Sequence, residues 1–196
     1  MRKTVLIVVA VAVLVGGMAT ISKYNTLQAK DEAVKAAWSQ VINVYKRRAD
    51  LVPNLINAIK GYTAHEQQTL TQVVEARTKA TSLNVNIEDA KSLQNFQAAQ
   101  GELQNALARL MVVVERYPDL KANKQFEDLQ VQLEGSENRI TVERQRYIET
   151  VQDFNTFIRM FPTNLIASHF GYLEKPNFTV ENEQQISNPP AVDFGK

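Results

Sequence analysis

The chain has 196 residues, which leaves room for one membrane-spanning segment and one domain of ordinary size. Its 22 basic and 21 acidic residues nearly cancel, so the chain lacks the basic surface that nucleic-acid binding requires, and we expect no nucleic-acid partner. The absence of cysteine excludes disulfides, thiolate metal sites, a cysteine nucleophile and any lipid attached through cysteine.

The first 23 residues predict a membrane anchor. Arg2 and Lys3 precede an apolar run without charges over residues 4–21, and ~17–20 apolar residues are enough to span a bilayer as a helix. A cleaved signal peptide is the alternative, but we favour an uncleaved anchor because the helical pattern of the next segment begins almost at once. The flanking charges balance and leave the orientation open. We expect a single-pass protein of the cell membrane with its domain exported to the periplasmic side.

A long helix is predicted from Tyr24 to Gly61. Its inward-facing residues recur at steps of three and four, which places them on one face, the seam by which a helix packs in a bundle or coiled coil. Pro53 lies inside this segment, and an interior proline normally kinks or ends a helix. Because the pattern resumes in the same register after it, we expect a kink in one continuous helix. The row consists of Leu27, Asp31, Val34, Trp38, Val41, Tyr45, Arg48, Val52, Leu55 and Ile59.

A second helix is predicted from Ala64 to Ser82. The residues from Thr63 to Glu66 have the Thr-x-x-Glu form of a capping box, which marks a helix start. Residues 83–89 lose the helical period and should form a connection. The side chains expected to face inward are Leu70, Val73, Val74 and Ala80.

Two longer helices follow. The third is predicted from Ala90 to Tyr117, because Pro118 pushes the residue before it out of helical geometry. Asn123 is the expected N-cap of the fourth, which runs to Phe161. The core positions of the fourth helix recur every seven residues, at Phe126, Leu133, Ile140, Tyr147, Phe154 and Phe161.

These patterns predict an all-α protein. Its expected architecture is an N-terminal transmembrane helix followed by an antiparallel four-helix bundle with long first and fourth helices. The anchor would cover residues 1–23 and the bundle residues 24–171, with one or two further helical turns over 163–170. Residues 172–196 contain three prolines and no apolar period, so we expect an extended or disordered tail there.

The paired arginines beside Pro53 are the first candidate site. Two guanidinium groups there could bind a carboxylate or a phosphate. We favour a solvated Arg47 and an Arg48 that pairs with a carboxylate on a neighbouring helix. If the first and fourth helices run antiparallel, Arg48 lies level with position 136, and Glu134 and Glu137 flank that level. The sequence therefore predicts a structural ion pair of Arg48 with one of these two glutamates.

The two histidines, His65 and His169, do not predict a metal site. A di-iron bundle needs Glu-x-x-His pairs, and the residues three positions earlier are Tyr62 and Ile166. His65 is followed by Glu66 but lacks the second histidine of a zinc-protease motif. No phosphate-binding glycine loop or serine-hydrolase turn is present. We therefore expect no catalytic residue, cofactor or metal.

The segment after Phe161 is the second candidate site. The predicted first and fourth helices have nearly equal lengths, so the fourth brings Phe161 back to the level of Lys23, where the chain leaves the bilayer. The apolar residues that follow would then lie at the membrane surface, or they would cover the membrane-proximal end of the bundle. These residues are Leu165, Ile166, Phe170 and Tyr172.

Short motifs recur along the chain: Ala37-Trp38-Ser39, Arg47-Arg48-x-Asp50-Leu51-Val52-Pro53-Asn54-Leu55, Lys60-Gly61-Tyr62-x-x-His65-Glu66, Glu115-Arg116-Tyr117-Pro118, Phe161-Pro162-x-Asn164 and Pro190-Ala191-Val192-Asp193-Phe194. Together they make the chain resemble the LemA family of bacterial membrane-anchored proteins, and the resemblance covers nearly all of it. One departure is Ala191, which is inserted between the proline and the valine of the motif near the C-terminus. The resemblance implies an N-terminal membrane helix and an antiparallel helical bundle. The family has no agreed biochemical activity, and some relatives belong to magnetosome membrane formation. The motif residues are Trp38, Arg47, Arg48, Asp50, Pro53, Asn54, Gly61, Tyr62, His65, Tyr117, Pro118, Asn123, Phe161, Pro162 and Asn164.

Three functions are compatible with the sequence. The first is a non-enzymatic, membrane-anchored helical scaffold that binds a membrane or envelope protein partner, and a homo-oligomer is compatible with the same long helices. The second is a membrane-surface or membrane-remodelling protein that contacts lipid through the segment after Phe161. The third, which we favour least, is an enzyme or small-ligand binder that uses the region of Arg48 and Glu137.

Overall fold

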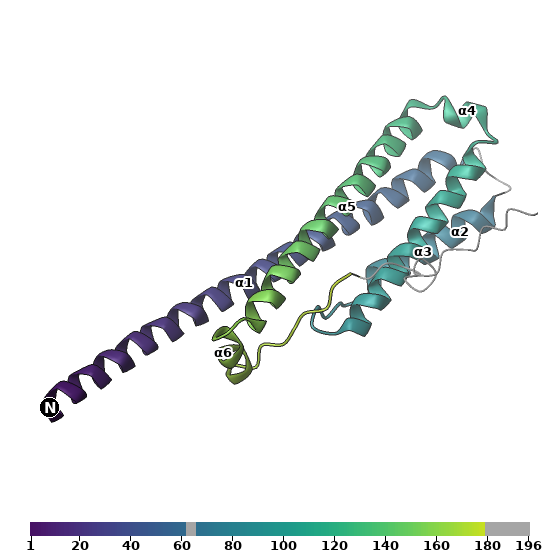
Figure 1. Ribbon diagram of the computed structural model, residues 1–196. Coiled ribbons are helices and arrows are strands. Elements are labelled where there is room, and N and C mark those ends of the chain that lie inside the picture. Colours follow the sequence, from purple (N-terminus) through teal and green to yellow (C-terminus); the bar gives the residue numbers. More distant parts are fainter. Residues whose placement is uncertain (62–65, 179–196) are drawn as a thin grey trace, which may run out of the picture.

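The computed structural model describes residues 1–61 and 66–178, and every regular element in these ranges is helical (Figure 1). The N-terminal part of α1 projects well beyond the other helices, which lie against its second part. In chain order the elements are α1 (Arg2–Ile59), α2 (Gln67–Ser82), α3 (Ala90–Val114), α4 (Pro118–Lys121), α5 (Lys124–Arg159) and α6 (Thr163–His169).

The first helix is continuous over 58 residues and passes through Pro53 without ending. At ~1.5 Å per residue it is about 87 Å long. Every member of the predicted seam is buried except Trp38, which is half-buried. The apolar run at the start of α1 is exposed throughout, and α1 is the one helix in the described ranges that is long and apolar enough to cross a membrane.

A side chain from α2 accommodates Pro53. Proline has no N–H group, so the carbonyl of Ala49, four residues earlier, loses its donor within the helix. Arg77 of α2 donates from Nε to this carbonyl at 2.8 Å. Ala49 is buried, and a buried carbonyl without a partner costs ~1–3 kcal/mol. The helix can therefore continue through Pro53 because α2 supplies the missing hydrogen bond.

The longer helices form two antiparallel pairs. α5 lies along α1, with Lys30 of α1 bonded to Asp153 near the end of α5 and Arg48 bonded to Glu137 nearer its start. α2 and α3 form a hairpin whose connection is the non-helical segment over residues 83–89, as expected. The hairpin lies beside the α1–α5 pair at the end far from the apolar run, and α6 lies at the near end (Figure 1).

The structure corrects one inward-facing position in α2. Val73 and Ala80 are buried and Leu70 is half-buried, but Val74 is 45 % exposed. The buried row continues through Ala76 instead, because steps of three and four follow one face, whereas adjacent residues are turned by about 100°. The helix begins at Gln67. The predicted start at position 64 and most of the predicted capping box lie outside the described residues.

The connection between α3 and α5 also differs in detail from the prediction. α3 ends at Val114 rather than Tyr117. The N–H groups of Arg116 and Tyr117 bond three residues back, which tightens the last turn. Pro118 then occupies the first position of α4, where its missing N–H is not needed. Asn123 caps α5 as expected, since its side chain accepts hydrogen bonds from the N–H groups of residues 125 and 126.

The predicted core position at Phe161 is wrong. The earlier members of the seven-residue row in α5, from Phe126 to Phe154, are buried, but Phe161 is 80 % exposed. α5 ends at Arg159, and Met160 adopts an extended backbone with φ −69° and ψ 140°. A seven-residue repeat holds one face only while the backbone stays helical. Phe161 therefore leaves the row once the chain turns.

Residues 172–178 form an extended strap, the name we use below for this segment. It follows the predicted short helix, α6, and lies against α1 and α5. The side chains of Lys175 and Phe178 are buried, although both lie in the segment that the sequence predicts to be tail. Asn155 of α5 fixes the backbone of Lys175 on both sides, since its Nδ2 donates to the Lys175 carbonyl at 2.8 Å and its Oδ1 accepts from the Lys175 N–H at 2.9 Å.

Two hydrophobic cores lie one after the other along the molecule. The distal core contains the last part of α1 after Arg48, the buried face of α2, the second half of α3 and the first part of α5. The proximal core contains α1 from Leu27 to Tyr45, the start of α3, the second part of α5, and Ala167 and Phe178. The two cores meet at the level of Arg48, where the candidate site begins.

Candidate functional site

A polar layer crosses the molecule between the two cores. It consists of Arg48 from α1, Gln100 from α3, and Ser136 and Glu137 from α5. The Arg48 guanidinium is 1 % exposed; its Nη1 donates to Glu137 Oε1 at 2.8 Å. Its Nη2 donates to Gln100 twice, to Oε1 at 2.8 Å and to the carbonyl oxygen at 3.0 Å. Glu137, one of the two glutamates considered from the sequence, is therefore the carboxylate that pairs with Arg48.

The polar layer connects all four of the longer helices. Gln100 Nε2 donates to the carbonyl of Ala80 in the last turn of α2, at 3.1 Å. Ser136 donates to the carbonyl of Leu133 within α5 at 2.7 Å. Glu134 is exposed and accepts from Gln130 at 3.1 Å. A buried charge with this many partners fixes the level at which four helices meet, and removing one member would leave the others unpaired.

Tyr45 borders the polar layer on the proximal side. The Cζ atom of Arg48 lies 5.1 Å from the centre of the Tyr45 ring, so the guanidinium also rests on an aromatic face. Burial raises the pKa of the Tyr45 hydroxyl, and the charges of Arg144 and Arg48 oppose this effect only in part. Tyr45 therefore stays neutral. Arg48 Nε is the buried side-chain nitrogen that has no hydrogen-bond partner in the described part of the chain.

The motif residues taken from the sequence do not gather into one site. Arg47, as expected, is exposed, and so are Asp50, Asn54 and Gly61. Trp38 packs in the proximal core, with its ring 5.3 Å from that of Phe96. Tyr62 and His65 lie outside the described residues. The remaining motif residues lie at the two ends of the helical domain, at Tyr117, Pro118 and Asn123 far from the apolar run and at Phe161, Pro162 and Asn164 near it.

The strap adds a second buried charge that the sequence analysis missed. Lys175 Nζ lies 2.8 Å from Asp31 Oδ1 and 3.5 Å from Glu88 Oε1, and its side chain is 4 % exposed. Burial alone would raise the pKa of Asp31, but its hydrogen bonds to Lys175 and Lys35 outweigh burial and lower it. Asp31 is a polar member of the seam predicted for the first helix. No local pattern around Lys175 marks it as the partner, because the strap has no period.

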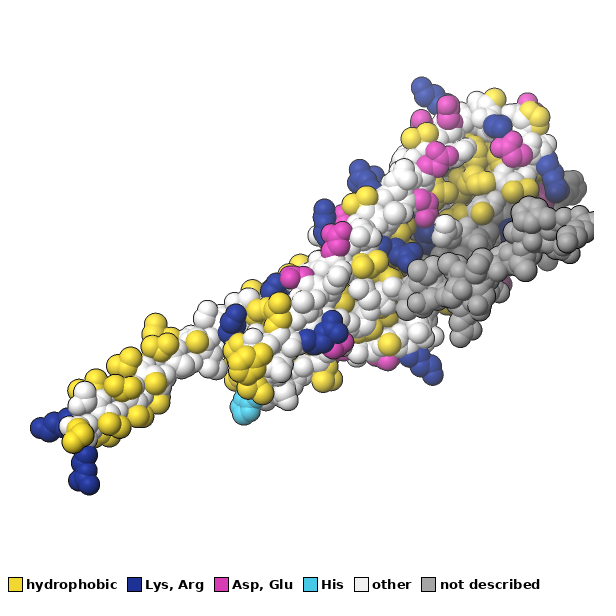
Figure 2. Space-filling view, viewed as in Figure 1, with side chains coloured by type: hydrophobic (Ala, Val, Ile, Leu, Met, Phe, Trp, Pro, Cys, Tyr) yellow, Lys and Arg dark blue, Asp and Glu magenta, His cyan; other side chains and the backbone are white. Residues whose placement is uncertain are grey.

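The end of the helical domain nearest the apolar run carries an exposed apolar patch. We call it the proximal patch; its residues are Met160, Phe161, Leu165, Phe170 and Leu173. Figure 2 shows hydrophobic side chains over the projecting part of α1 and again over α6.

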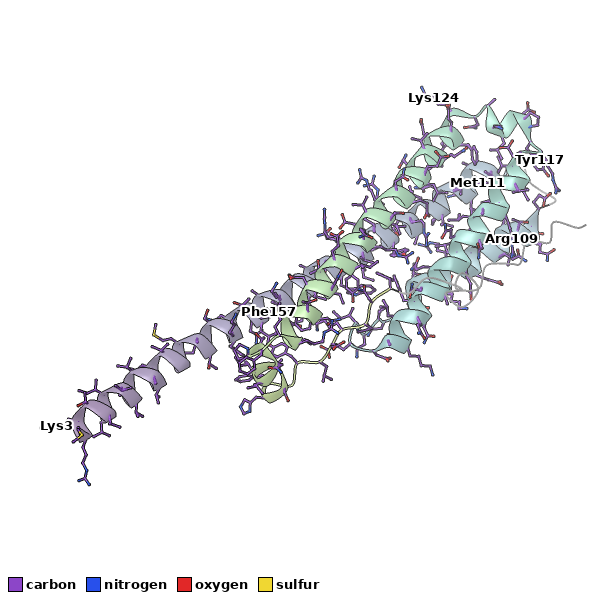
Figure 3. All side chains as sticks on the ribbon, in the orientation of Figure 1. Lys3, Arg109, Met111, Tyr117, Lys124 and Phe157 are labelled. Carbon is purple, nitrogen blue, oxygen red and sulfur yellow. The ribbon has the colours of Figure 1, made fainter. Side chains whose placement is uncertain are left out.

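Two of the predicted interfacial residues are less exposed than the patch. Ile166 and Tyr172 are half-buried, and Phe170 rests on Tyr24 of α1 with 4.6 Å between ring centres. Phe157 of α5, labelled in Figure 3, lies 5.6 Å from Lys23 Nζ. α6 and the end of α5 therefore pack against α1 where the apolar run ends.

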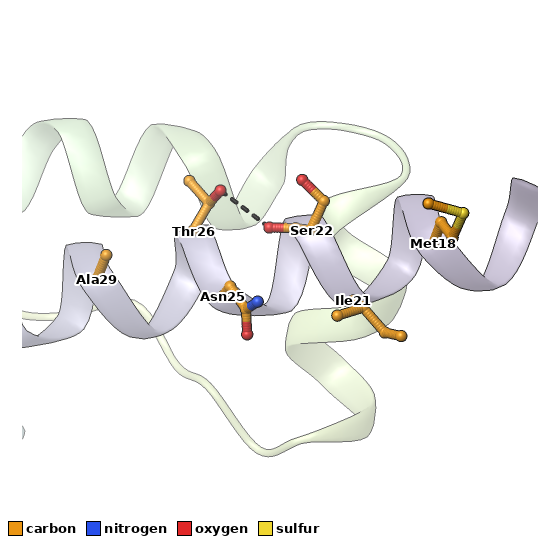
Figure 4. Close-up of a pocket in the computed structure, with 6 residues that line it drawn as sticks. All are labelled: Met18, Ile21, Ser22, Asn25, Thr26 and Ala29. Atoms are coloured by element: carbon orange, nitrogen blue, oxygen red, sulfur yellow. Dashed lines mark hydrogen bonds between the residues drawn. The ribbon is translucent and has the colours of Figure 1, made fainter.

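A wide hollow lies along α1 at the same level (Figure 4). It contains Met18 and Ile21 on the apolar side and Ser22, Asn25 and Thr26 on the polar side. The Thr26 hydroxyl donates to the Ser22 carbonyl at 3.0 Å, so the polar groups are partly used within the helix. Its lining carries no charged side chain. The hollow marks the change from apolar to polar side chains and offers no group for catalysis.

Within residues 1–61 and 66–178, no three His, Asp or Glu side chains gather in a way that could hold a metal ion. His169 contacts the ring of Phe170, with 5.0 Å between centres. Glu137, the carboxylate of the polar layer, is bonded to Arg48. The one carboxylate of the polar layer is therefore held in an ion pair.

Comparison with known proteins identifies the family to which the chain is similar. The profile of the LemA family matches residues 37–194. Magnetosome protein MamQ 2 of Paramagnetospirillum magneticum is 25 % identical over 207 aligned residues, which cover 95 % of this chain and 75 % of that protein. Protein LemA of Metamycoplasma hominis is 24 % identical, over 75 % of this chain and 64 % of that protein.

A third relative, magnetosome protein MamQ of Magnetospirillum gryphiswaldense, is 22 % identical over 87 % of this chain and 68 % of that protein. None of these names describes an enzymatic activity. The family profile spans the polar layer, the proximal core from Ala37 onwards and the strap, and the chain therefore belongs to the LemA family.

Proposed function

We propose that this protein is a membrane-anchored, non-enzymatic helical scaffold that binds a membrane or envelope protein partner. In this proposal residues 1–23 span the membrane once, and α1, α2, α3 and α5 act as one antiparallel four-helix bundle outside it. The observation that carries the proposal is the continuity of α1, which runs from the exposed apolar segment into both cores. A domain joined in this way is held at a set distance from the bilayer.

Two further observations support a non-enzymatic protein at a membrane. Two charged side chains that are almost fully buried are each held in an ion pair: Arg48 with Glu137, and Lys175 with Asp31. Such pairs stabilise an arrangement of helices and leave those carboxylates less able to act as acids or bases. Relatives named as magnetosome proteins also favour a place beside a membrane.

Partner capture from native membranes tests the scaffold. The full chain at native abundance would be cross-linked in intact membranes and purified. Its matched control is residues 1–23 joined to an unrelated soluble helical domain. Proteins recovered reproducibly with the full chain and absent from the control would support the proposal. Recovery of the same proteins with both chains, or of none with a folded bait, would contradict it.

Export of the domain has its own test, because the chain contains no cysteine. Single cysteines would replace Lys3 and Arg109, which lie at opposite ends of the molecule (Figure 3). With a membrane-impermeant maleimide, we expect Arg109→Cys to be labelled in intact cells and Lys3→Cys only after permeabilisation. The reverse pattern would place the helical domain in the cytoplasm and refute this part of the proposal.

A second function is favoured by the proximal patch. Phe161 and Leu165 are 80 % and 63 % exposed, and they lie where α1 would leave the bilayer. Aromatic and aliphatic side chains are stabilised in the interfacial layer of a membrane, so the patch could hold the domain against the lipid surface or act on the membrane itself.

Lipid contact can be measured with a matched pair of positions. Leu165 and Val131 are equally exposed, at 63 %, but Val131 lies in the first part of α5, about 42 Å along the helix from Arg159. Each would be replaced by cysteine and labelled with a dye in the full chain, reconstituted in vesicles that contain nitroxide-labelled headgroups. Quenching at 165 and not at 131 would support lipid contact. Equal quenching, or none at 165, would contradict it.

A further inference from the structure

A groove lies on the proximal side of the polar layer, between α1, α3 and α5. Its volume is about 360 Å³, within the range of ~300–1,000 Å³ that small-molecule sites occupy. Arg48, Glu137 and Arg144 contribute its charges, and Ile140, Ile148 and Phe178 contribute apolar surface. We call it the Arg144 groove, after the arginine in its lining that forms no ion pair with a described residue.

The charges of the groove do not cancel. Two guanidinium groups and one carboxylate leave a net charge of one positive unit. Arg48 is bonded to Glu137, whereas Arg144 forms no ion pair with a described residue. Its guanidinium lies over the ring of Phe178, with 4.8 Å between Cζ and the ring centre. The neighbouring Arg146 is different, because it pairs with Glu143 at 3.0 Å on the surface.

The half-buried position of Arg144 makes its charge available to a ligand. A guanidinium presents parallel N–H groups that match the two oxygens of a carboxylate. The apolar side chains beside it would cover the part of a ligand that adjoins the carboxylate. Glu137 repels a second negative charge in the same groove, so a monoanion is favoured over a phosphate dianion.

We propose that the Arg144 groove binds a monocarboxylate that carries an apolar group. The carboxylate pairs with the Arg144 guanidinium, and the apolar group packs against Ile140, Ile148 and Phe178. This chemistry occurs in a free small carboxylic acid and at the C-terminus of a peptide chain from a partner. The site does not depend on the scaffold role, although a peptide ligand would give that role a recognition element.

Fluorescence of Trp38 can report binding directly. It is the one tryptophan in the chain, and its ring lies 6.1 Å from that of Phe178, which lines the groove. The full chain in a nonionic detergent would be titrated with N-acetyl-leucine, with N-acetyl-leucine amide and with inorganic phosphate. We expect a saturable change in emission with the acid, none with the amide, and weaker binding of phosphate.

Two variants make the assignment specific. Arg144→Gln should weaken binding of N-acetyl-leucine by about tenfold or more, since a charge-assisted pair is lost. Arg146→Gln, which removes an adjacent arginine outside the groove, should change it by less than about twofold. Helical circular dichroism and the melting temperature would verify that each variant is folded. If Arg144→Gln is unfolded, Arg144→Lys replaces it and is expected to bind more weakly than wild type.

Titration with a peptide distinguishes a free carboxylic acid from the C-terminus of a partner protein as the natural ligand. Tetra-alanyl-leucine with a free C-terminus carries the same terminal group as N-acetyl-leucine on a longer chain. Tighter binding of the peptide would identify a partner's chain end as the ligand, and equal affinity would identify a free acid. Three results would overturn the proposal: no saturable response to either acid, equal binding of the amide, or equal weakening in the two arginine variants.

Discussion

Replacing Arg77 by methionine is expected to destabilise the helical domain by ~2 kcal/mol. Methionine retains most of the apolar stem of arginine and removes the donor to the Ala49 carbonyl. This carbonyl cannot bond within α1, because Pro53 occupies the position of its usual donor. An unsatisfied buried acceptor costs ~1–3 kcal/mol, and the lost bond involves a charged donor, so the middle of that range applies.

A double-mutant cycle with Pro53→Ala isolates this interaction. Alanine at position 53 restores an N–H that can bond to the Ala49 carbonyl, and it removes a proline that costs an exposed helix ~3 kcal/mol. Pro53→Ala alone should therefore leave the domain unchanged or more stable. In that background Arg77→Met should cost less than ~1 kcal/mol. The expected coupling between the two substitutions is ~1–2 kcal/mol.

Guanidinium unfolding followed by Trp38 fluorescence measures the cycle in the full chain in detergent. Trp38 lies 5.4 Å from the Tyr147 ring in the proximal core, so its emission changes when that core unfolds. Arg139→Met is the matched control, because Arg139 is exposed on α5. An equal cost of Arg77→Met with proline and with alanine at 53 would refute the reasoning, and so would a cost no larger than the control's.

Three further outcomes are expected in the same assay. Arg48→Met and Glu137→Gln should each cost ~3 kcal/mol, and the double variant should be more stable than the sum of the two costs predicts; zero coupling would exclude a structural pair. Asp31→Asn should cost ~3 kcal/mol at neutral pH, since it removes the 2.8 Å partner of the buried Lys175 and leaves only Glu88, at 3.5 Å. Because the pKa of Asp31 is lowered on folding, its contribution is present above 3.8 and is lost as the pH falls through the folded-state pKa, so the two proteins should converge in acid. Asn123→Ala should cost ~1 kcal/mol through the lost cap, and a neutral result would contradict the cap's role.

The helical pattern of the sequence predicted the buried face of α1 with few errors. Apolar residues that recur every three or four positions mark the buried face of a long helix, because such a helix packs against a core with one apolar face. The position on α5 that lies opposite Arg48 could also be calculated, because two antiparallel helices have the same rise per residue. The carboxylate at that level in the structure is Glu137.

Features without a period could not be predicted in this way. The strap is extended and is held by single contacts, such as Lys175 to Asp31 and Asn155 to the strap backbone. The pairing of Arg77 with Ala49 depends on how α2 lies beside α1, and the proline that creates the need is on a different helix. The seven-residue row of apolar residues continues to Phe161, although α5 ends at Arg159. The spacing of residues in the sequence does not indicate where the helix ends.

The uninterrupted α1 acts mechanically as a lever. Residues 23–59 extend about 54 Å from the end of the predicted anchor, and no loop or linker lies between the two. Tilting the anchor by about 10° would therefore move the far tip of α1 by about 9 Å at this rise per residue. A rotation of the anchor about its own axis would turn the helix on which both cores are built. If residues 1–23 span a bilayer as proposed, a force on the far tip of α1 would act on that bilayer as a torque through the same helix.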